Sequence, residues 1–212
     1  MLPIPLVLGL SLLLALLCSA MPWLARTLHD RSLAIGLVAG IIVSLIGVVS
    51  TRGALFPWTG LGVLLVAWSG GLLLGRGIAP RFPPFLLWFL CLSVIDVGLT
   101  AGLSLSGPQT SAGSTPLHFG DFLLILPWGR FETNVVDILL ITALAEHWRR
   151  RGQAYLLALL PSALGFLLAD GFVLVTGVGL LPGIPFLTVG YLCTEGLYRS
   201  ISRHRGATAS GL

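Results

Sequence analysis

The sequence predicts an all-α membrane protein of about seven transmembrane helices, and three observations support this fold class. Only 9% of the 212 residues are charged, and 56% are hydrophobic. The mean hydropathy is correspondingly high, at +0.98. A soluble domain carries roughly 25% charged residues, so this chain has too few of them to cover a surface that faces water. The third observation is a series of apolar runs, most of them close to the roughly 20 residues that a helix needs to cross a bilayer.

Seven apolar segments qualify, or nearly qualify, as membrane spans. The first lacks a basic region before it and is longer than the apolar part of a secretory signal, so we expect it to be retained. The fifth is short, and the seventh contains Gly183 and Pro185, which predict an irregular start. The segments are residues 3–23, 33–50, 59–76, 84–104, 134–148, 154–175 and 180–198.

The arginines predict the orientation. The chain has no lysine, and ten of its twelve basic residues fall on alternate connections between the segments. Basic residues favour the cytoplasmic side, which places the N-terminus outside and the C-terminus inside. The net charge of +4 therefore indicates orientation, and no nucleic-acid partner is expected. The ten inner arginines are Arg26, Arg31, Arg76, Arg81, Arg149, Arg150, Arg151, Arg199, Arg203 and Arg205, and the two outer ones are Arg52 and Arg130.

Two outer segments are longer than simple turns. One is the small segment 51–60 after the second span, and the other is the long loop 104–133 between the fourth and fifth spans. The first half of the long loop is rich in Gly, Ser, Thr and Pro, which is typical of a flexible connection. Its second half, around FLLILPWGRF, is apolar and is expected to lie along the membrane surface.

Four acidic residues fall within or near the spans, where ionisable groups are costly and indicate function. They are Asp96, Asp137, Asp170 and Glu195. The topology places Asp96 in the outer half of the fourth span and Asp137 about one turn below the outer end of the fifth. Two carboxylates that face each other at this depth can share a proton, activate a water and protonate a departing group. The alternative is structural: one aspartate caps a helix and the other bonds across helices.

The order of four short motifs resembles that of lipoprotein signal peptidase (signal peptidase II), a family of intramembrane aspartyl proteases. The motifs are TRGALF at 51–56, LSVIDV at 92–97, HFGDFL at 118–123 and TNVVDI at 133–138. The resemblance covers residues 33–148, which it implies to be a four-helix core. One helix, within residues 1–32, is added before this core. Two more helices and a basic cytoplasmic tail follow it in residues 149–212.

The resemblance also assigns roles to residues. It implies that Asp96 and Asp137 are the catalytic aspartates, and that Asn134, Asp121, Gly53 and Phe56 are substrate-binding positions. Three further candidate substrate-binding positions do not come from matched motif residues: Ser93 beside Asp96, and the two outer arginines, Arg52 and Arg130. Asn134 orients the carboxylates or substrate, or caps a helix. The two arginines meet lipid phosphate or anchor the chain at the interface. Ser93 and Val97 flank Asp96 where the family has asparagine and arginine, and Thr51 and Thr133 also depart from the family motifs.

The implied function is hydrolysis of a membrane-anchored, lipid-modified precursor protein at the outer face of a bacterial cytoplasmic membrane. Membrane lipid and the precursor are then the partners, and no metal or other cofactor is expected. Two other functions fit the sequence. A proton-coupled transporter subunit would use Asp96, Asp170 and Glu195 as a relay, although Glu195 has no obvious partner in the sequence and Asp170-Gly171 is typical of a turn. A non-catalytic protein would bind lipidated partners on the same scaffold.

Overall fold

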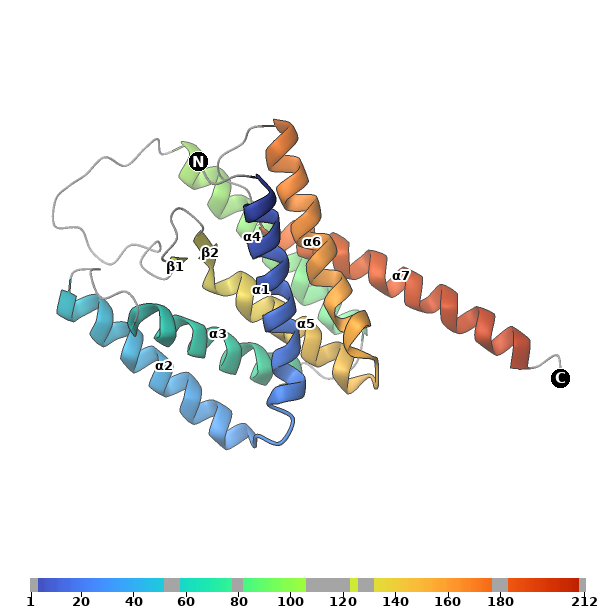
Figure 1. The fold of residues 1–212 in the computed structure, drawn as a ribbon, viewed down its shortest axis with the longest axis horizontal. Coiled ribbons are helices and arrows are strands. Elements are labelled where there is room, and N and C mark those ends of the chain that lie inside the picture. The colour runs from blue at the N-terminus through green and yellow to red at the C-terminus, as the bar shows by residue number, and fades with distance from the viewer. Residues whose placement is uncertain are drawn as a thin grey trace.

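The computed structural model describes residues 4–51, 58–77, 82–105, 123–125, 132–176 and 183–209. Within these ranges the chain forms seven helices and one short pair of strands, arranged as Figure 1 shows. The helices are α1 (Ile4–Leu24), α2 (Asp30–Thr51), α3 (Trp58–Gly77), α4 (Phe82–Leu105), α5 (Val135–Arg150), α6 (Tyr155–Thr176) and α7 (Gly183–Ala209).

The apolar segments predicted the positions of the helices well. The first six observed helices begin and end within three residues of their predicted bounds. The last helix differs, because α7 continues to Ala209 through the segment predicted as a tail. No proline interrupts residues 199–209, so the helix is not forced to stop where the apolar run ends. The expectation of a turn at Asp170-Gly171 is wrong, since α6 passes through both residues to Thr176.

Two strands depart from the all-α prediction. β1 (Leu123–Ile125) and β2 (Glu132–Asn134) pair in antiparallel fashion, with Leu123 opposite Asn134 and Ile125 opposite Glu132. The pairing satisfies backbone hydrogen-bonding groups that an isolated extended segment would leave to solvent. β2 leads directly into α5, so the ribbon lies at the amino end of that helix.

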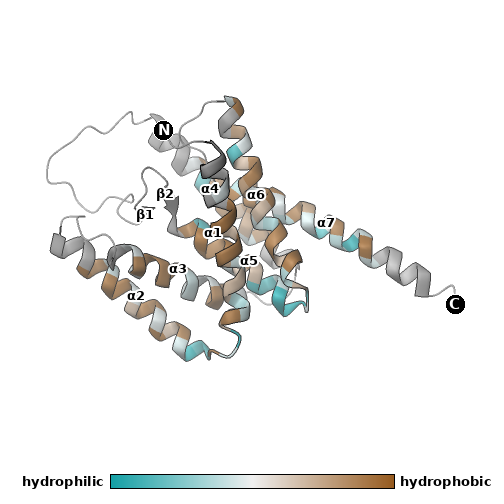
Figure 2. Cartoon of the chain, viewed as in Figure 1, coloured by the Kyte–Doolittle hydropathy of each residue, from teal (hydrophilic) through white to brown (hydrophobic). Residues whose placement is uncertain are grey.

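Two helices in the described residues are long and apolar enough to cross a membrane. They span Gly60–Gly77 in α3 and Tyr155–Phe172 in α6, and shorter apolar stretches cover Leu12–Leu24 and Leu86–Gly98. Figure 2 shows hydrophobic residues along most of the described helix length, with hydrophilic residues near the α1–α2 and α5–α6 connections. The expectation of a helical chain is therefore confirmed, and the full set of seven spans stays a prediction.

The helix α5 lies at the centre of the fold. It packs against α3, α1, α6 and α7. Its side chains from Ile138 to Trp148 are almost all buried and supply much of the largest apolar cluster. A helix surrounded in this way is held in place along its whole length. Residues at its amino end, Asp137 among them, are therefore held at a defined position relative to the neighbouring helices.

Glycines allow the helices to approach one another closely. A Cβ atom at Gly71 of α3 would lie 2.5 Å from the carbonyl oxygen of Leu139 in α5, and one at Gly190 of α7 would overlap the carbonyl of Pro161 in α6. Small residues at such contacts let backbones pack together, which is typical of helices that associate without a hydrophobic driving force. These contacts fix α3 against α5 and α7 against α6.

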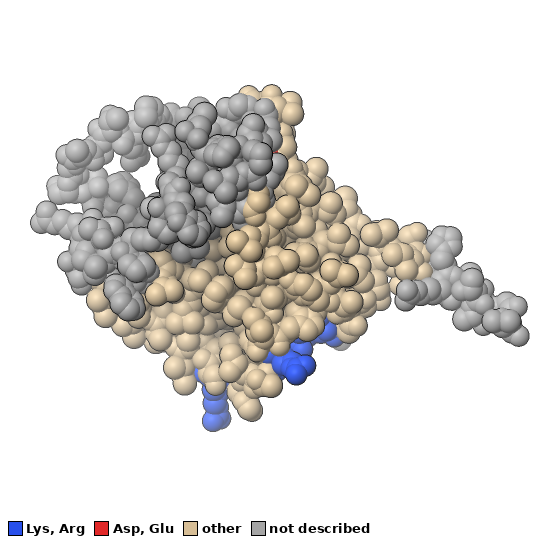
Figure 3. Space-filling view, in the orientation of Figure 1, with Lys and Arg blue, Asp and Glu red and all other residues tan. Residues whose placement is uncertain are grey.

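A network of ion pairs closes one end of the molecule. The side chain of Glu146 is fully buried, and its carboxylate lies 2.7 Å from Arg149, 3.0 Å from Arg150 and 3.4 Å from Arg76. Arg76 also bonds to Asp30 at 2.7 Å and to the carbonyl of Leu28. In Figure 3 the basic side chains in view gather at the lower edge, on the side of the α1–α2 and α5–α6 connections. These ion pairs thus join the start of α2, the end of α3 and the last turn of α5 at a single end.

Contacts cross the predicted division of the chain at residues 32 and 148. The helix α1 packs on α5 and α6, and α4 makes its most extensive contacts with α7. Among the described residues, α4 has little direct contact with α5. In the described residues, α4 therefore packs mainly on α7, which lies outside segment 33–148.

Candidate functional site

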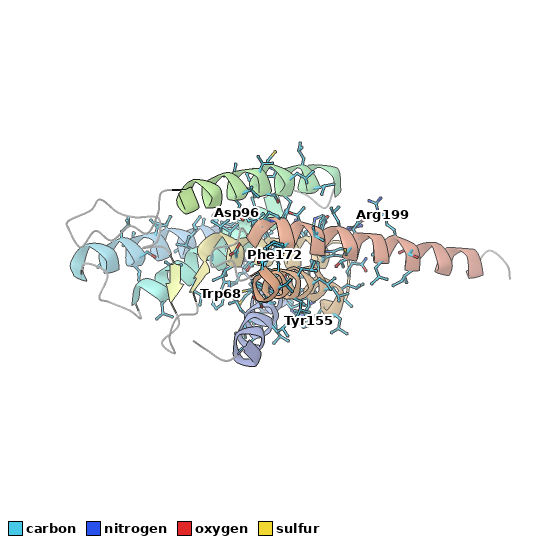
Figure 4. The ribbon with its side chains drawn as sticks, turned by 90° about the horizontal axis from the view of Figure 1, so that it is seen from above. Trp68, Asp96, Tyr155, Phe172 and Arg199 are labelled. Atoms are coloured by element: carbon cyan, nitrogen blue, oxygen red, sulfur yellow. The ribbon has the colours of Figure 1, made fainter. Side chains whose placement is uncertain are left out.

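The carboxylate of Asp96 lies against the amino end of α7. Its Oδ2 atom accepts a 2.9 Å hydrogen bond from the backbone N–H of Ile184. The first N–H groups of a helix have no partner within the helix and are therefore available to an acceptor of this kind. Figure 4 shows Asp96 between α4 and the start of α7. A carboxylate also complements the positive end of the helix dipole.

Asp137 of α5 lies against the same first turn of α7. It occupies the first turn of α5, and a Cβ atom built on Gly183 would lie 2.9 Å from its Oδ1 atom and 3.2 Å from its Cγ atom. Gly183 is the first residue of α7 and directly precedes Ile184. Two aspartates from different helices, 41 positions apart in the sequence, thus converge on two consecutive residues of α7.

The packing of α4 along α7 sets the orientation of Asp96. The hydroxyl of Ser93 lies 2.8 Å from that of Thr188, and the rings of Phe89 and Tyr191 stack with centroids 6.1 Å apart. Residues 96, 93 and 89 on α4 face residues 184, 188 and 191 on α7, which is the register of an antiparallel helix pair. The helical spacing of these contacts keeps one face of α4 on α7, so Asp96 points at the first turn of α7.

A second set of contacts fixes the level of α5 beside α7. His147 Nε2 lies 3.1 Å from the hydroxyl of Tyr191, and Arg151 at the end of α5 pairs with Glu195. The offset between partners is 44 residues in both cases and 46 for Asp137 and Gly183. A nearly constant offset describes two helices running side by side in the same direction. Asp137 is therefore held level with the first turn of α7.

The remaining predicted site residues are described less fully. Asn134 ends β2 directly before α5, at the position of a helix N-cap, as one of its two expected roles requires. Ser93 donates its hydroxyl to the carbonyl of Phe89 or bonds to Thr188, so it contributes to the contact of α4 with α7. The predicted positions Gly53, Phe56, Arg52, Asp121 and Arg130 lie outside the described residues.

Glu195 is paired with two arginines, one of them distant in the sequence. Its carboxylate pairs with Arg151 and, at 2.9 Å, with Arg199, and its side chain is only 3% exposed. Arg151 also lies over the rings of Trp148 and Tyr198, at 4.9 Å and 5.2 Å from their centroids. The prediction that Glu195 has no obvious partner is wrong, because Arg199 lies one turn further along α7 and Arg151 approaches from the α5–α6 connection. Glu195 ties the α5–α6 connection to α7.

Gly183 and Ile184 are residues of this region that sequence reasoning did not select. The Gly-Ile-Pro segment at 183–185 was noted as an irregular start of the last span, and that irregularity is the available signal. In the ranges covered by the structure, no group of three or more His, Cys, Asp or Glu residues is placed to hold a metal ion. No protein-family model, no curated protein and no solved structure matches the chain. The resemblance to signal peptidase II stays a prediction from the motifs.

Proposed function

We propose that this chain is an integral membrane protein whose seven helices cross the bilayer, with the N-terminus outside and the C-terminus inside. Large aliphatic side chains project from its outer helices, among them Ile35 of α2 at 70% exposed and Val94 of α4 at 73%. Contiguous exposed apolar surface of this extent suits hydrocarbon rather than water. The charged network around Glu146 closes one end, as basic residues on the cytoplasmic side require.

The proposed activity is that of an aspartyl hydrolase with Asp96 and Asp137 as its catalytic pair. The observation that carries this proposal is the convergence of both carboxylates on Gly183 and Ile184. One carboxylate of such a pair removes a proton from a water molecule while that water attacks a peptide carbonyl. The other carboxyl group protonates the leaving nitrogen. Both groups must act on one scissile peptide bond, and the start of α7 is the element that both of them contact.

The resemblance of the motifs to signal peptidase II supplies the substrate class. The expected substrate is a precursor protein anchored in the outer leaflet of a bacterial cytoplasmic membrane by a lipid-modified cysteine. Asp137 belongs to the first turn of α5, and the proposed topology places that turn towards the outer face. A lipid-anchored segment reaches a site at this depth without leaving the membrane.

The ion pairs of Glu195 give less support to the proton-relay function. A relay residue must exchange protons, whereas Glu195 is buried between Arg151 and Arg199. Two adjacent guanidinium groups favour the charged form of a carboxylate and oppose its protonation. Glu195 therefore fits a structural role, holding the α5–α6 connection against α7.

Cleavage of a synthetic diacylglyceryl-modified precursor peptide, followed by mass spectrometry, tests the proposed activity. The purified full chain in lipid nanodiscs is compared with Asp96→Asn, Asp137→Asn and a control, Asp170→Asn, which changes a helical aspartate outside the pair. We expect cleavage before the modified cysteine by the wild type and the control, and none by the first two variants. A well-folded wild type that leaves the peptide intact, or two variants that still cut it, would contradict the proposal.

A further inference from the structure

The first turn of α7 is the element that joins the two aspartates. In the described part of the chain α4 packs mainly on α7, and α5 packs mainly on α3 and α1. Asp96 and Asp137 therefore owe their common position to a helix that follows both of them in the sequence. This helix lies outside the segment 33–148 that carries the motif resemblance.

Residue 183 lies beside Asp137 without a side chain of its own. A Cβ atom there would come within 2.9 Å of Oδ1 and 3.2 Å of Oδ2, closer than an uncharged carbon normally approaches a carboxylate oxygen. The backbone of Gly183 does not have a positive φ, since the only described glycine with one is Gly152. An alanine is thus compatible with the backbone at 183, and its Cβ atom would displace the carboxylate of Asp137.

The N–H of Ile184 has a separate role. It donates to Asp96 Oδ2 at 2.9 Å, and its position at the start of α7 leaves it without a partner inside the helix. A proline at this position would remove the N–H, and the first turn of a helix tolerates proline. The hydrogen bond can therefore be removed by substitution without an expected break in α7.

We infer that Gly183 and the backbone N–H of Ile184 are positioning groups of the site. The N–H fixes the carboxylate of Asp96, and the absence of a side chain at 183 lets the start of α7 approach the carboxylate of Asp137 closely enough to set its position. This inference rests on the proposed function. It assigns to α7 a share in the site that the motifs of segment 33–148 do not contain.

Two matched pairs of variants test the inference in the cleavage assay. Gly183→Ala is compared with Gly196→Ala on the same helix, where an added Cβ atom meets nothing within 4 Å. Ile184→Pro is compared with Ile184→Val, which keeps the N–H. We expect Gly183→Ala to lower kcat about 100-fold with little change in KM, as misplacement by about 1 Å does. We expect Ile184→Pro to lower kcat about 10-fold and Ile184→Val, which keeps the N–H, to lower it much less, whereas Gly196→Ala should match the wild type.

A measurement without substrate separates this inference from the proposed function. The carboxyl C=O band is followed by infrared difference spectroscopy against pH in the wild type, Ile184→Pro and Ile184→Val. Loss of this hydrogen bond should displace the titration of one carboxyl, and only in the proline variant. An unchanged titration, or wild-type kcat in both Gly183→Ala and Ile184→Pro, would overturn the inference while leaving the aspartate pair in place. Absence of cleavage by the wild type overturns the proposed function, and the infrared titration then still decides the role of Ile184.

Discussion

The backbone N–H of Ile184 donates a 2.9 Å hydrogen bond to the carboxylate of Asp96, which joins two helices across 88 positions of the sequence. A short distance along the same turn, Gly183 lies against the carboxylate of Asp137. The start of α7 therefore connects the fourth and fifth helices. The stability of the α4–α7 contact and the arrangement of the two acids depend on the same residues.

The contact between Asp96 and Ile184 predicts different effects for two substitutions of the aspartate. Asp96→Asn keeps an oxygen that accepts the N–H, whereas Asp96→Ala leaves the buried donor without an acceptor. We expect Asp96→Ala to lower the free energy of unfolding by about 1–3 kcal/mol and Asp96→Asn to lower it by less. Unfolding in mixed detergent micelles, followed by circular dichroism, measures both. Equal losses in the two variants would show that the hydrogen bond does not hold α4 on α7.

Close packing of α6 on α7 predicts a strong effect at Gly190. A Cβ atom at this position would overlap the carbonyl of Pro161, whereas one at Gly196 meets no atom within 4 Å. We expect Gly190→Ala to destabilise the protein by about 1–3 kcal/mol, as overpacking does. Gly196→Ala should be neutral or stabilising by up to about 1 kcal/mol, because alanine has the higher helix propensity. Thermal unfolding of both variants in one detergent checks the prediction, and similar melting temperatures would contradict this packing.

The ion pairs of Glu195 predict a structural effect and no effect on chemistry. Glu195→Gln leaves Arg151, whose side chain is 18% exposed, without its charged partner. We expect a loss of about 3 kcal/mol in unfolding free energy for this variant. Arg199 is 51% exposed, so Arg199→Gln should cost no more than about 1 kcal/mol.

Activity separates the two possible roles of Glu195. Peptide cleavage by folded Glu195→Gln should equal that of the wild type, because its contacts lie about three turns along α7 from Ile184. Proton uptake by vesicles that contain the protein is measured in parallel. Proton movement by the wild type that the substitution abolishes would favour the relay instead.

The proposed orientation predicts which engineered cysteines are reached from outside the cell. The background lacks the two exposed native cysteines, Cys91 and Cys193. His29→Cys lies in the exposed α1–α2 connection, and Thr110→Cys lies in the predicted outer loop. A membrane-impermeant maleimide added to intact cells should label Thr110→Cys at once and His29→Cys only after permeabilisation. Labelling in the reverse order would invert the topology.

The apolar runs predicted seven helices because segment length and composition depend on local sequence alone. They did not predict which helix faces meet. A helix that is hydrophobic on all sides gives no signal of the face that packs, unlike an amphipathic helix on a soluble core. The predicted topology gave Asp96 and Asp137 a similar depth in the membrane. It did not indicate that both lie against the start of α7, because that contact depends on packing between residues 88 positions apart.

The same limit explains the other differences from the sequence predictions. Glu195 finds Arg151 only because α5 and α7 run side by side, and neither residue indicates the other locally. The pairing of Leu123–Ile125 with Glu132–Asn134 depends on a reversal of the chain between them that composition alone did not indicate.

Disulfide formation between engineered cysteines tests most directly whether the start of α7 contacts both α4 and α5, and so brings Asp96 and Asp137 together. In the background without Cys91 and Cys193, one pair is Asp137→Cys with Gly183→Cys, and the other is Ser93→Cys with Thr188→Cys, whose native hydroxyl oxygens lie 2.8 Å apart. The control joins Asp137→Cys with Gly196→Cys, about 20 Å further along the helix at 1.5 Å per residue. With mild oxidant in native membranes, both pairs should form disulfides within one chain and the control should not. If neither pair links, or if the control links as readily, α7 does not bring Asp96 and Asp137 together.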